Sequence, residues 1–193
     1  MWVRRSAIRP VPQYAKVPET AVDAVHEGLA DNEEEARAQL DEAFEQFEKS
    51  QPALATYIGE QLSDPLDDTA LALGYFLALA IWMAFERTHG GELSAVSEED
   101  LSTARELLEL DESLRRSDPN EMMDSDDIIA IEQPALLSFV NRHLEATLQA
   151  HADSIDVDDV AQIYRAVLIE VLALSYAVTK PAGLPADKAA MLA

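Results

Sequence analysis

Apolar residues recur along most of this chain at intervals of three and four, the spacing of one face of an α-helix. The clearest stripe comprises Ala36, Leu40, Ala43, Phe44 and Phe47. No stretch keeps the strict alternation of apolar and polar residues that marks a half-buried strand. The pattern therefore predicts an all-α protein with about eight helices and no β-sheet.

Helix-start signals divide the chain into elements. Asp31 or Asn32 can cap a helix, and Pro52 ends that helix while suiting the first turn of the next. Ser97 and Asp100 resemble a capping box. These signals predict helices over 19–29, from 33 to Pro52, from Pro52 to about 62, and over 67–87, 97–116, 134–148 and 157–179.

The tetrapeptide Gln51-Pro52-Ala53-Leu54 recurs 82 positions later as Gln133-Pro134-Ala135-Leu136. The similarity continues as Tyr57 with Phe139, Ile58 with Val140 and Leu62 with Leu144. We interpret this as an internal duplication, with repeat 1 at about 19–88 and repeat 2 at about 97–179. The second repeat carries a nine-residue insertion before its last helix, because 14 residues separate Leu144 from Asp159 where 5 separate Leu62 from Asp68. We expect two related four-helix units packed as one bundle.

Residues 69–85 contain no charge and form the strongest candidate for a membrane span. A span needs about 20 apolar residues, and no cluster of lysine or arginine flanks this segment. The matching segment 157–179 contains Arg165 and Glu170, which suit a lipid environment poorly. We therefore expect helices 67–87 and 157–179 to form the centre of the bundle, with no association with a membrane.

The chain has 193 residues, 37 acidic and 14 basic, and a formal net charge of -23. This field repels nucleic-acid phosphates and anionic membrane surfaces, and it favours cationic partners. Adaptation to a salty cytoplasm, or solubility alone, is the alternative explanation. The absence of cysteine excludes disulfides, thiolate zinc sites and cysteine nucleophiles.

Residues 1–18 differ from the rest because they carry four basic residues, no acidic one, and prolines at 10, 12 and 18. They predict an extended basic arm. The arm either lies on the acidic body of its own chain or of a sister subunit, or binds a partner. Residues 19–180 form one all-α domain, and 181–193 a flexible tail. The N-terminal residues have no continuous apolar segment and no small-residue cleavage site, so we expect no secretory signal and a cytoplasmic location.

Five residues are candidates for ligand binding. Gln51 and Gln133 either bond backbone groups at the helix junctions or line a shared groove. Arg165 and Glu170 either reach helix edges, with their charged ends in water, or line a polar pocket between the repeats. Gly74 corresponds to Arg165 in the first repeat and would leave room for a small ligand.

Glu86 and His89 have the Glu-x-x-His spacing of helical di-iron sites, which lets both side chains face one metal. Such sites need a second motif and two more carboxylates, which the sequence does not supply. His89 otherwise suits the end of its helix, where positive charge is favoured. The acidic run near 153–159 lacks the Gly and Glu of a calcium-binding loop.

No phosphate-binding loop or nucleophile motif is present, which disfavours an enzyme. We expect a non-enzymatic, acidic helical interaction or regulatory protein with no cofactor, a protein partner that is cationic, and a homodimeric state. One alternative is a metal-dependent helical-bundle enzyme using Glu86 and His89. The other is a DNA mimic or a module that binds basic proteins.

Overall fold

The computed structural model describes residues 6–30, 33–63, 66–117, 123–152 and 155–183. Within these ranges the chain is all-helical, with eight α-helices and no strand, as the sequence pattern predicts. The helices are α1 (Glu19–Ala30), α2 (Glu33–Ser50), α3 (Pro52–Gln61), α4 (Asp68–His89), α5 (Glu98–Ser117), α6 (Ser125–Glu132), α7 (Pro134–Ala150) and α8 (Val157–Ala177). Short 3-10 turns cover Gln13–Ala15 and Gly90–Glu92.

The helix boundaries have local causes. The Asp67 carboxylate accepts hydrogen bonds from the backbone of Thr69 and Ala70, both at 2.9 Å, and so caps α4. Gly90 ends α4 with a φ of +40°, a conformation that glycine adopts without steric cost. Pro52 and Pro134 open α3 and α7, where a missing N–H does no harm.

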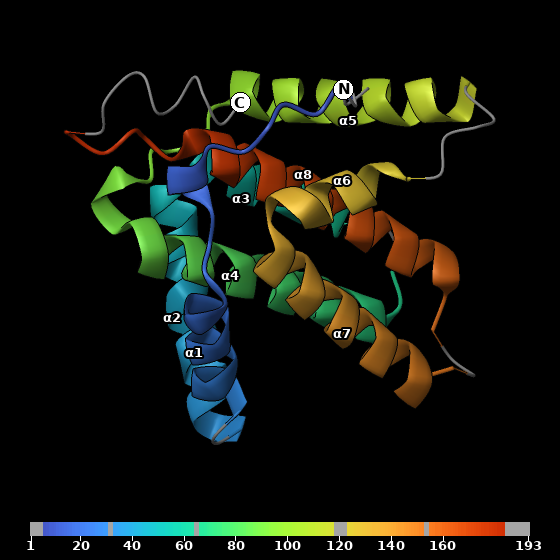
Figure 1. Cartoon of the computed structure of the whole chain (residues 1–193). Helices are drawn as coiled ribbons and strands as arrows, with labels where there is room; N and C mark the ends of the chain where they lie inside the picture. Colours follow the sequence, from blue (N-terminus) through green and yellow to red (C-terminus); the bar gives the residue numbers. More distant parts are fainter. Residues whose placement is uncertain (1–5, 31–32, 64–65, 118–122, 153–154, 184–193) are drawn as a thin grey trace.

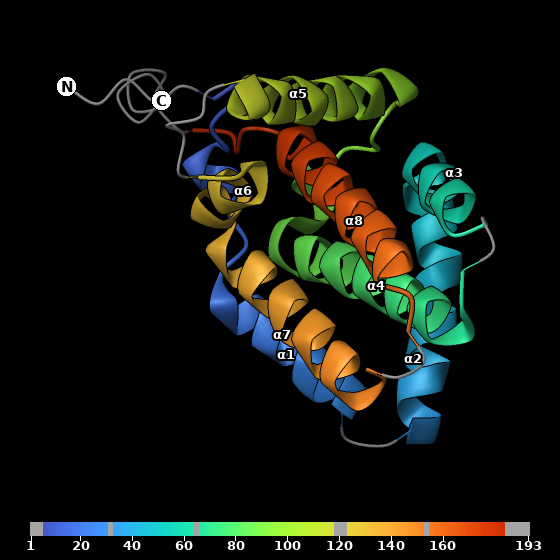
Figure 2. The same ribbon diagram turned by 90° about the vertical axis from the view of Figure 1, so that its right-hand side faces the viewer.

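The core is built around α4 and α8, which contact each other in the middle of the bundle (Figures 1 and 2). Both have the length and apolar composition of a membrane span, yet 61% and 67% of their most apolar windows are buried against other helices. This burial is the arrangement expected of central bundle helices. The other six helices pack around this pair.

Helix contacts in the first half of the chain match those in the second half. Within the first four helices, α1 contacts α2 and α4, and α2 contacts α3 and α4. Within the last four, α5 contacts α6 and α8, and α6 contacts α7 and α8. Between the halves, α3 contacts α5 and α8, while α7 contacts α1 and α4. A duplicated unit would give this pattern, and the duplication stays a prediction.

The described part of the N-terminal arm, residues 6–18, lies along its own chain. Its apolar residues Ile8, Val11, Ala15 and Val17 are buried in the common core. The carbonyl of Arg9 accepts a hydrogen bond from the Tyr176 hydroxyl at 2.8 Å, and the Arg9 guanidinium lies 4.6 Å from the centre of that ring. Residues 1–5, like 184–193 of the predicted tail, lie outside the described residues.

Candidate functional site

Gln51 and Gln133 are both buried, and each bonds the backbone of an extended segment. The Gln133 amide donates to the Ala15 carbonyl and to the Ser175 hydroxyl, both at 2.9 Å, and its oxygen accepts from Val17 N–H at 3.0 Å. The Gln51 amide donates to the Ser94 carbonyl at 3.1 Å and accepts from Val96 N–H at 2.8 Å. Both side chains therefore bond backbone, as the first interpretation expected. That backbone belongs to the segments before α1 and α5, because neither glutamine side chain caps its own helix.

Gly74 does not open a pocket beside Arg165. A Cβ atom at Gly74 would lie 2.6 Å from a methyl group of Leu62 and 3.3 Å from Ile163. The glycine thus permits close packing of α4 against the end of α3 and against α8. The ligand space predicted at Gly74 is wrong, because packed side chains fill it.

Arg165 and Glu170 lie in different surroundings. Arg165 is partly exposed and pairs with Glu112 and, at 3.6 Å, with Glu109 on α5. Its head reaches the helix edge, as one of the interpretations expected. Its neighbours Glu109 and Glu112 are acidic residues that neutralise it.

Glu170 is fully buried, and neither of its carboxylate oxygens has a hydrogen-bond partner among the described residues. The expectation that its head reaches water is wrong. Burial raises the pKa of Glu170 well above its ordinary value, because desolvation penalises the charged form. Burial also raises the pKa of Tyr57 on α3 to about 12, and Arg105, Arg165 and Glu170 all act on that hydroxyl. Glu170 therefore lies in the core near the junction of α3, α5 and α8, where its raised pKa favours the neutral form.

Glu86 and His89 do not converge on one metal ion. Glu86 is exposed, whereas His89 is buried at the end of α4 with its ring near Phe85. Burial lowers the pKa of His89, which disfavours the cationic form that the sequence suggested at this helix end. No group of three or more His, Asp or Glu side chains within the described ranges is placed to hold a metal.

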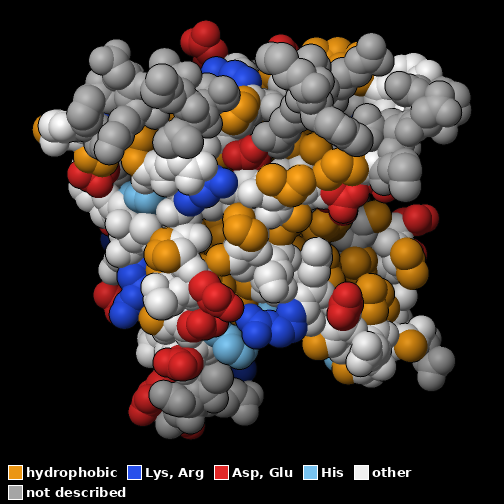
Figure 3. Space-filling model, viewed as in Figure 1, with side chains coloured by type: hydrophobic (Ala, Val, Ile, Leu, Met, Phe, Trp, Pro, Cys, Tyr) orange, Lys and Arg blue, Asp and Glu red, His pale blue; other side chains and the backbone are white. Residues whose placement is uncertain are grey.

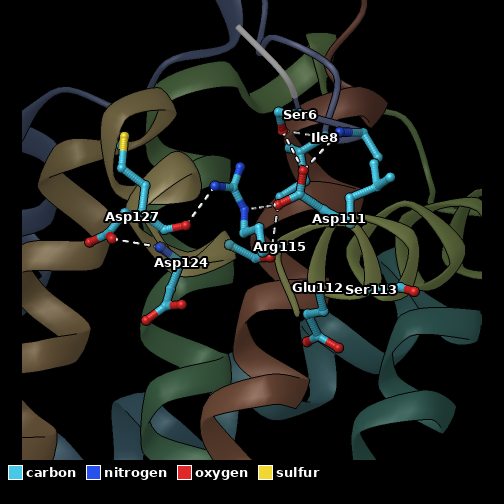
Figure 4. Close-up of polar contacts among 12 residues, drawn as sticks. Ser6, Ile8, Asp111, Glu112, Ser113, Arg115, Asp124 and Asp127 are labelled. Atoms are coloured by element: carbon cyan, nitrogen blue, oxygen red, sulfur yellow. Dashed lines mark hydrogen bonds and ion pairs between the residues drawn. The ribbon is translucent and has the colours of Figure 1, made fainter. Parts of the chain in front are cut away.

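A buried polar cluster that the sequence did not reveal holds the start of the arm (Figure 4). The Asp111 carboxylate accepts hydrogen bonds from the Ser6 hydroxyl, the Ala7 N–H and the Ser125 hydroxyl at 2.7–2.8 Å. Arg115 donates to Asp111 at 2.5 Å and to the Met123 carbonyl at 2.6 Å. Burial alone would raise the pKa of Asp111, but these donors outweigh it and lower that pKa.

A largely apolar hollow lies between α2, α3 and α4. Helices α2 and α3 lie at the side of the bundle opposite α6 (Figure 2). The volume of the hollow is about 380 Å³. Most of its lining is aromatic, aliphatic or small, and Glu48 and Thr56 are the polar members. The other lining residues are Phe44, Phe47, Pro52, Ala55, Ile58, Gly59, Tyr75, Ala78 and Leu79. Phe44 is 37% exposed at this hollow, and its ring meets that of Tyr75 edge to face at 6.2 Å. We call this hollow the α2–α3–α4 groove.

The α2–α3–α4 groove lies beside the most acidic helix of its half. In α2, EEEARAQLDEAFEQFEKS, seven side chains are acidic and two are basic. Glu48 lines the groove itself, and Asp41 lies one turn before Phe44 on the same helix face, with Glu45 at the edge of that face. Acidic side chains also gather at the lower end of the molecule, where α1 and α2 lie (Figure 3). The groove therefore combines an apolar lining with an anionic border.

The chain matches no protein-family model, no curated protein and no solved structure.

Proposed function

We propose that the protein is a non-enzymatic interaction module that binds a basic, amphipathic helix of a protein partner in the α2–α3–α4 groove. The observation that carries this proposal is Phe44, a partly exposed aromatic side chain on a strongly acidic helix, at the opening of an apolar hollow. Exposed apolar surface with a polar border commonly marks a protein interaction site. A helix with one apolar face docks into such grooves through residues spaced three and four apart.

The lining suits a helical partner because small residues let its side chains approach. A Cβ atom built on Gly59 would meet no other atom within 4 Å, so this position faces open space. Ala55 lies one turn before Gly59 on α3, and Ala78 lines the groove from α4. An apolar side chain of the partner can occupy this space and contact the Phe44 and Tyr75 rings.

The charge of the partner follows from the border. Glu45 pairs only with Lys49, at 3.4 Å, and both side chains are about three-quarters exposed. Such an exposed pair contributes little and can be exchanged for a partner's cation. Because Glu48 and Asp41 add to the same field, Lys or Arg residues flanking an apolar stripe complement this surface.

The test is fluorescence polarisation with a labelled peptide that has Leu at intervals of three and four and Lys at the positions between, and with its counterpart carrying Glu in place of Lys. We expect the Lys peptide to bind, more weakly as salt rises, and the Glu peptide not to bind. Gly59→Leu places a side chain where a Cβ atom meets open space, and it should weaken binding at least tenfold, as should Phe44→Ala.

Val157→Ala is the control, because Val157 is 68% exposed at the start of α8 and is not among the residues that line the groove. It should bind the Lys peptide like the parent protein. If Gly59→Leu and Phe44→Ala also bind like the parent, the peptide is held by net charge alone and the groove has no such role.

A further inference from the structure

Two histidine side chains meet where α1, α4 and α7 pack together. His26 of α1 and His143 of α7 have ring centroids 5.3 Å apart, and we call them the histidine pair. The His143 ring also lies 4.4 Å from Phe139 of its own helix and 4.9 Å from Phe76 of α4. Figure 2 shows α1 and α7 side by side along one side of the bundle. The histidine pair is therefore part of the contact between these two helices.

No ion pair neutralises the histidine pair in the part of the chain that the structure describes. The Nε2 atom of His143 is buried and has no hydrogen-bond partner among the described residues. The charges that act on His143 are those of His26 and Arg142, and both oppose its protonation. Arg142 lies beside the same rings, with its guanidinium 6.0 Å from the centre of Phe139. Protonation of His143 would thus place a cation among aromatic rings and other positive groups.

The surrounding helices do carry acidic groups, but these lie at exposed or partly exposed positions. Asp23 and Glu27 of α1 are both exposed. Asp68 of α4 is partly exposed and lines a shallow hollow together with His143 and His151. Within the described ranges no ion pair joins these three carboxylates to either imidazole, so none of them compensates a proton on the histidine pair by direct contact.

Helix α1 is anchored more weakly than α7. Its buried side chains are all small, and in the described part of the helix they are Ala21, Val22 and Val25. Gly28 also lowers the helix propensity of this 12-residue element. Helix α7 instead buries Phe139 and three leucines. Local opening takes place in elements with few buried apolar contacts, so α1 is the helix that can separate from its neighbour.

We propose that the histidine pair is an acid-sensitive contact between α1 and α7. The two helices pack together while His143 is neutral, and α1 separates locally when His143 takes up a proton. Separation lets water reach His143 and moves the His26 ring away, so the open form binds the proton more tightly than the closed form. Burial lowers the pKa of His143 in the closed form, in agreement with this direction. This contact is separate from the α2–α3–α4 groove, which neither helix lines.

Acid therefore increases the population of the open form. Below the ordinary histidine pKa of 6.5, the ratio of open to closed protein rises by up to about tenfold for each pH unit, until pH reaches the lowered pKa of His143 in the closed form. From pH 7.5 to 5.5 the rise is about tenfold, because most of it falls below pH 6.5. Gln133 holds Val17 immediately before α1, so we expect the opposite end of α1, beyond His26, to move.

The test is amide hydrogen exchange of the full chain at pH 7.5 and 5.5, measured by mass spectrometry and corrected for the pH dependence of the intrinsic exchange rate. We expect the protection factor of residues 19–30 to fall about tenfold at pH 5.5. It should stay below that of α8 at both pH values, because α8 lies in the core and opens only with the whole fold. In His143→Phe the protection factor of residues 19–30 should be equal at the two pH values. His151→Gln, at an exposed position beyond α7, is the control and should keep the fall.

Three results would overturn the proposal. Equal protection of residues 19–30 at pH 7.5 and 5.5 would show that no proton drives the opening. Equal protection of residues 19–30 and of α8 would show that α1 opens only by global unfolding. A fall that persists in His143→Phe would assign the proton to another group. The first two results need only the parent protein.

Discussion

Gln51 and Gln133 each bond the segment that leads into the first helix of the opposite half of the chain. Gln133 holds Ala15 and Val17 before α1, and Gln51 holds Ser94 and Val96 before α5. In both cases one amide group spans a carbonyl and an N–H two residues apart. The halves are therefore tied to each other by hydrogen bonds as well as by the contact of α4 with α8.

Replacing either glutamine should destabilise the protein, and Gln133 should matter more. Gln133→Ala leaves three polar partners without their bonds in a fully buried site, whereas Gln51→Ala leaves two. At about 1 kcal/mol or more for each buried partner, we expect losses of roughly 3–4 and 2 kcal/mol in the free energy of unfolding. Urea denaturation measures both.

The control for these variants is Gln46→Ala, because Gln46 is exposed on α2 and bonds only Glu42 of its own helix. Its loss should stay below about 0.5 kcal/mol. Equal effects of Gln46→Ala and Gln133→Ala would show that the buried bonds contribute no more than exposed ones.

Glu170→Gln should make the protein more stable at neutral pH. The folded chain keeps Glu170 protonated above the pKa of the unfolded chain, near 4.5, so the parent protein loses stability as pH rises from there to the folded pKa. The loss has a limit of about 1.4 kcal/mol per pH unit. Glutamine does not titrate, and it therefore removes this slope.

The measurement is the difference in unfolding free energy between Glu170→Gln and the parent protein at pH 4.5, 6 and 7.5. We expect the difference to grow in favour of the variant as pH rises. A constant difference over this range would mean that Glu170 is ionised in the folded protein and that a partner compensates its charge.

Helix class and boundaries were predictable because local chemistry sets them. Prolines, acidic caps and three-to-four spacing act within one or two turns, and they identified most of the helices. The burial of α4 followed from its uncharged stretch over 69–85, and that of α8 from its long, mostly apolar sequence. The prediction for Glu170 was wrong because a charged residue in an apolar stripe can either reach water or lie buried. Only the packing of α3 and α5 on α8 determines which of the two occurs.

The contacts that hold the arm could not be predicted from spacing. Asp111 lies 105 residues from Ser6, and nothing near it in the sequence indicates a bond to the arm. Even so, Asp111 occupies a position of the inner stripe of α5, among Leu101, Ala104 and Leu108. An acidic residue in an apolar stripe was the one available signal that a distant backbone or side-chain donor completes the site.

His143→Phe should reduce the loss of unfolding free energy that the protein shows as pH falls below about 6.5. His143 lies in a ring cluster with its centroid 4.4 Å from that of Phe139, 4.9 Å from Phe76 and 5.3 Å from His26. Burial lowers its pKa, and the charges of His26 and Arg142 lower it further. The unfolded chain therefore takes up this proton first, and stability falls as pH drops from about 6.5 toward the folded pKa.

Phenylalanine removes that proton and keeps a ring in the cluster. Urea unfolding at pH 7.5 and 5.5 should show a smaller acid loss for His143→Phe than for the parent protein, by up to about 1 kcal/mol. His151→Gln, at an exposed position beyond α7, should retain the full acid loss. The prediction fails if both variants lose as much stability as the parent protein.

Asp111→Asn should loosen the arm and destabilise the fold. The change leaves the buried Arg115 side chain without its carboxylate, and breaking one side of a buried ion pair costs about 3–5 kcal/mol. The lowered pKa of Asp111 adds a pH effect: the parent protein loses this stabilisation only below the ordinary aspartate pKa of 3.8, as pH falls toward the folded pKa. The asparagine variant lacks that acid-side loss.

Two measurements separate a loosened arm from general destabilisation. Trypsin cleavage after Lys16, at a protein concentration and temperature where both proteins are folded, reports release of the arm, because Val17 is buried in the parent protein. Cleavage should be faster in Asp111→Asn and unchanged in Asp41→Asn, at an exposed position of α2. If the unfolding free energy falls while cleavage after Lys16 stays slow, Asp111 acts through α5 and α6 and does not hold the arm.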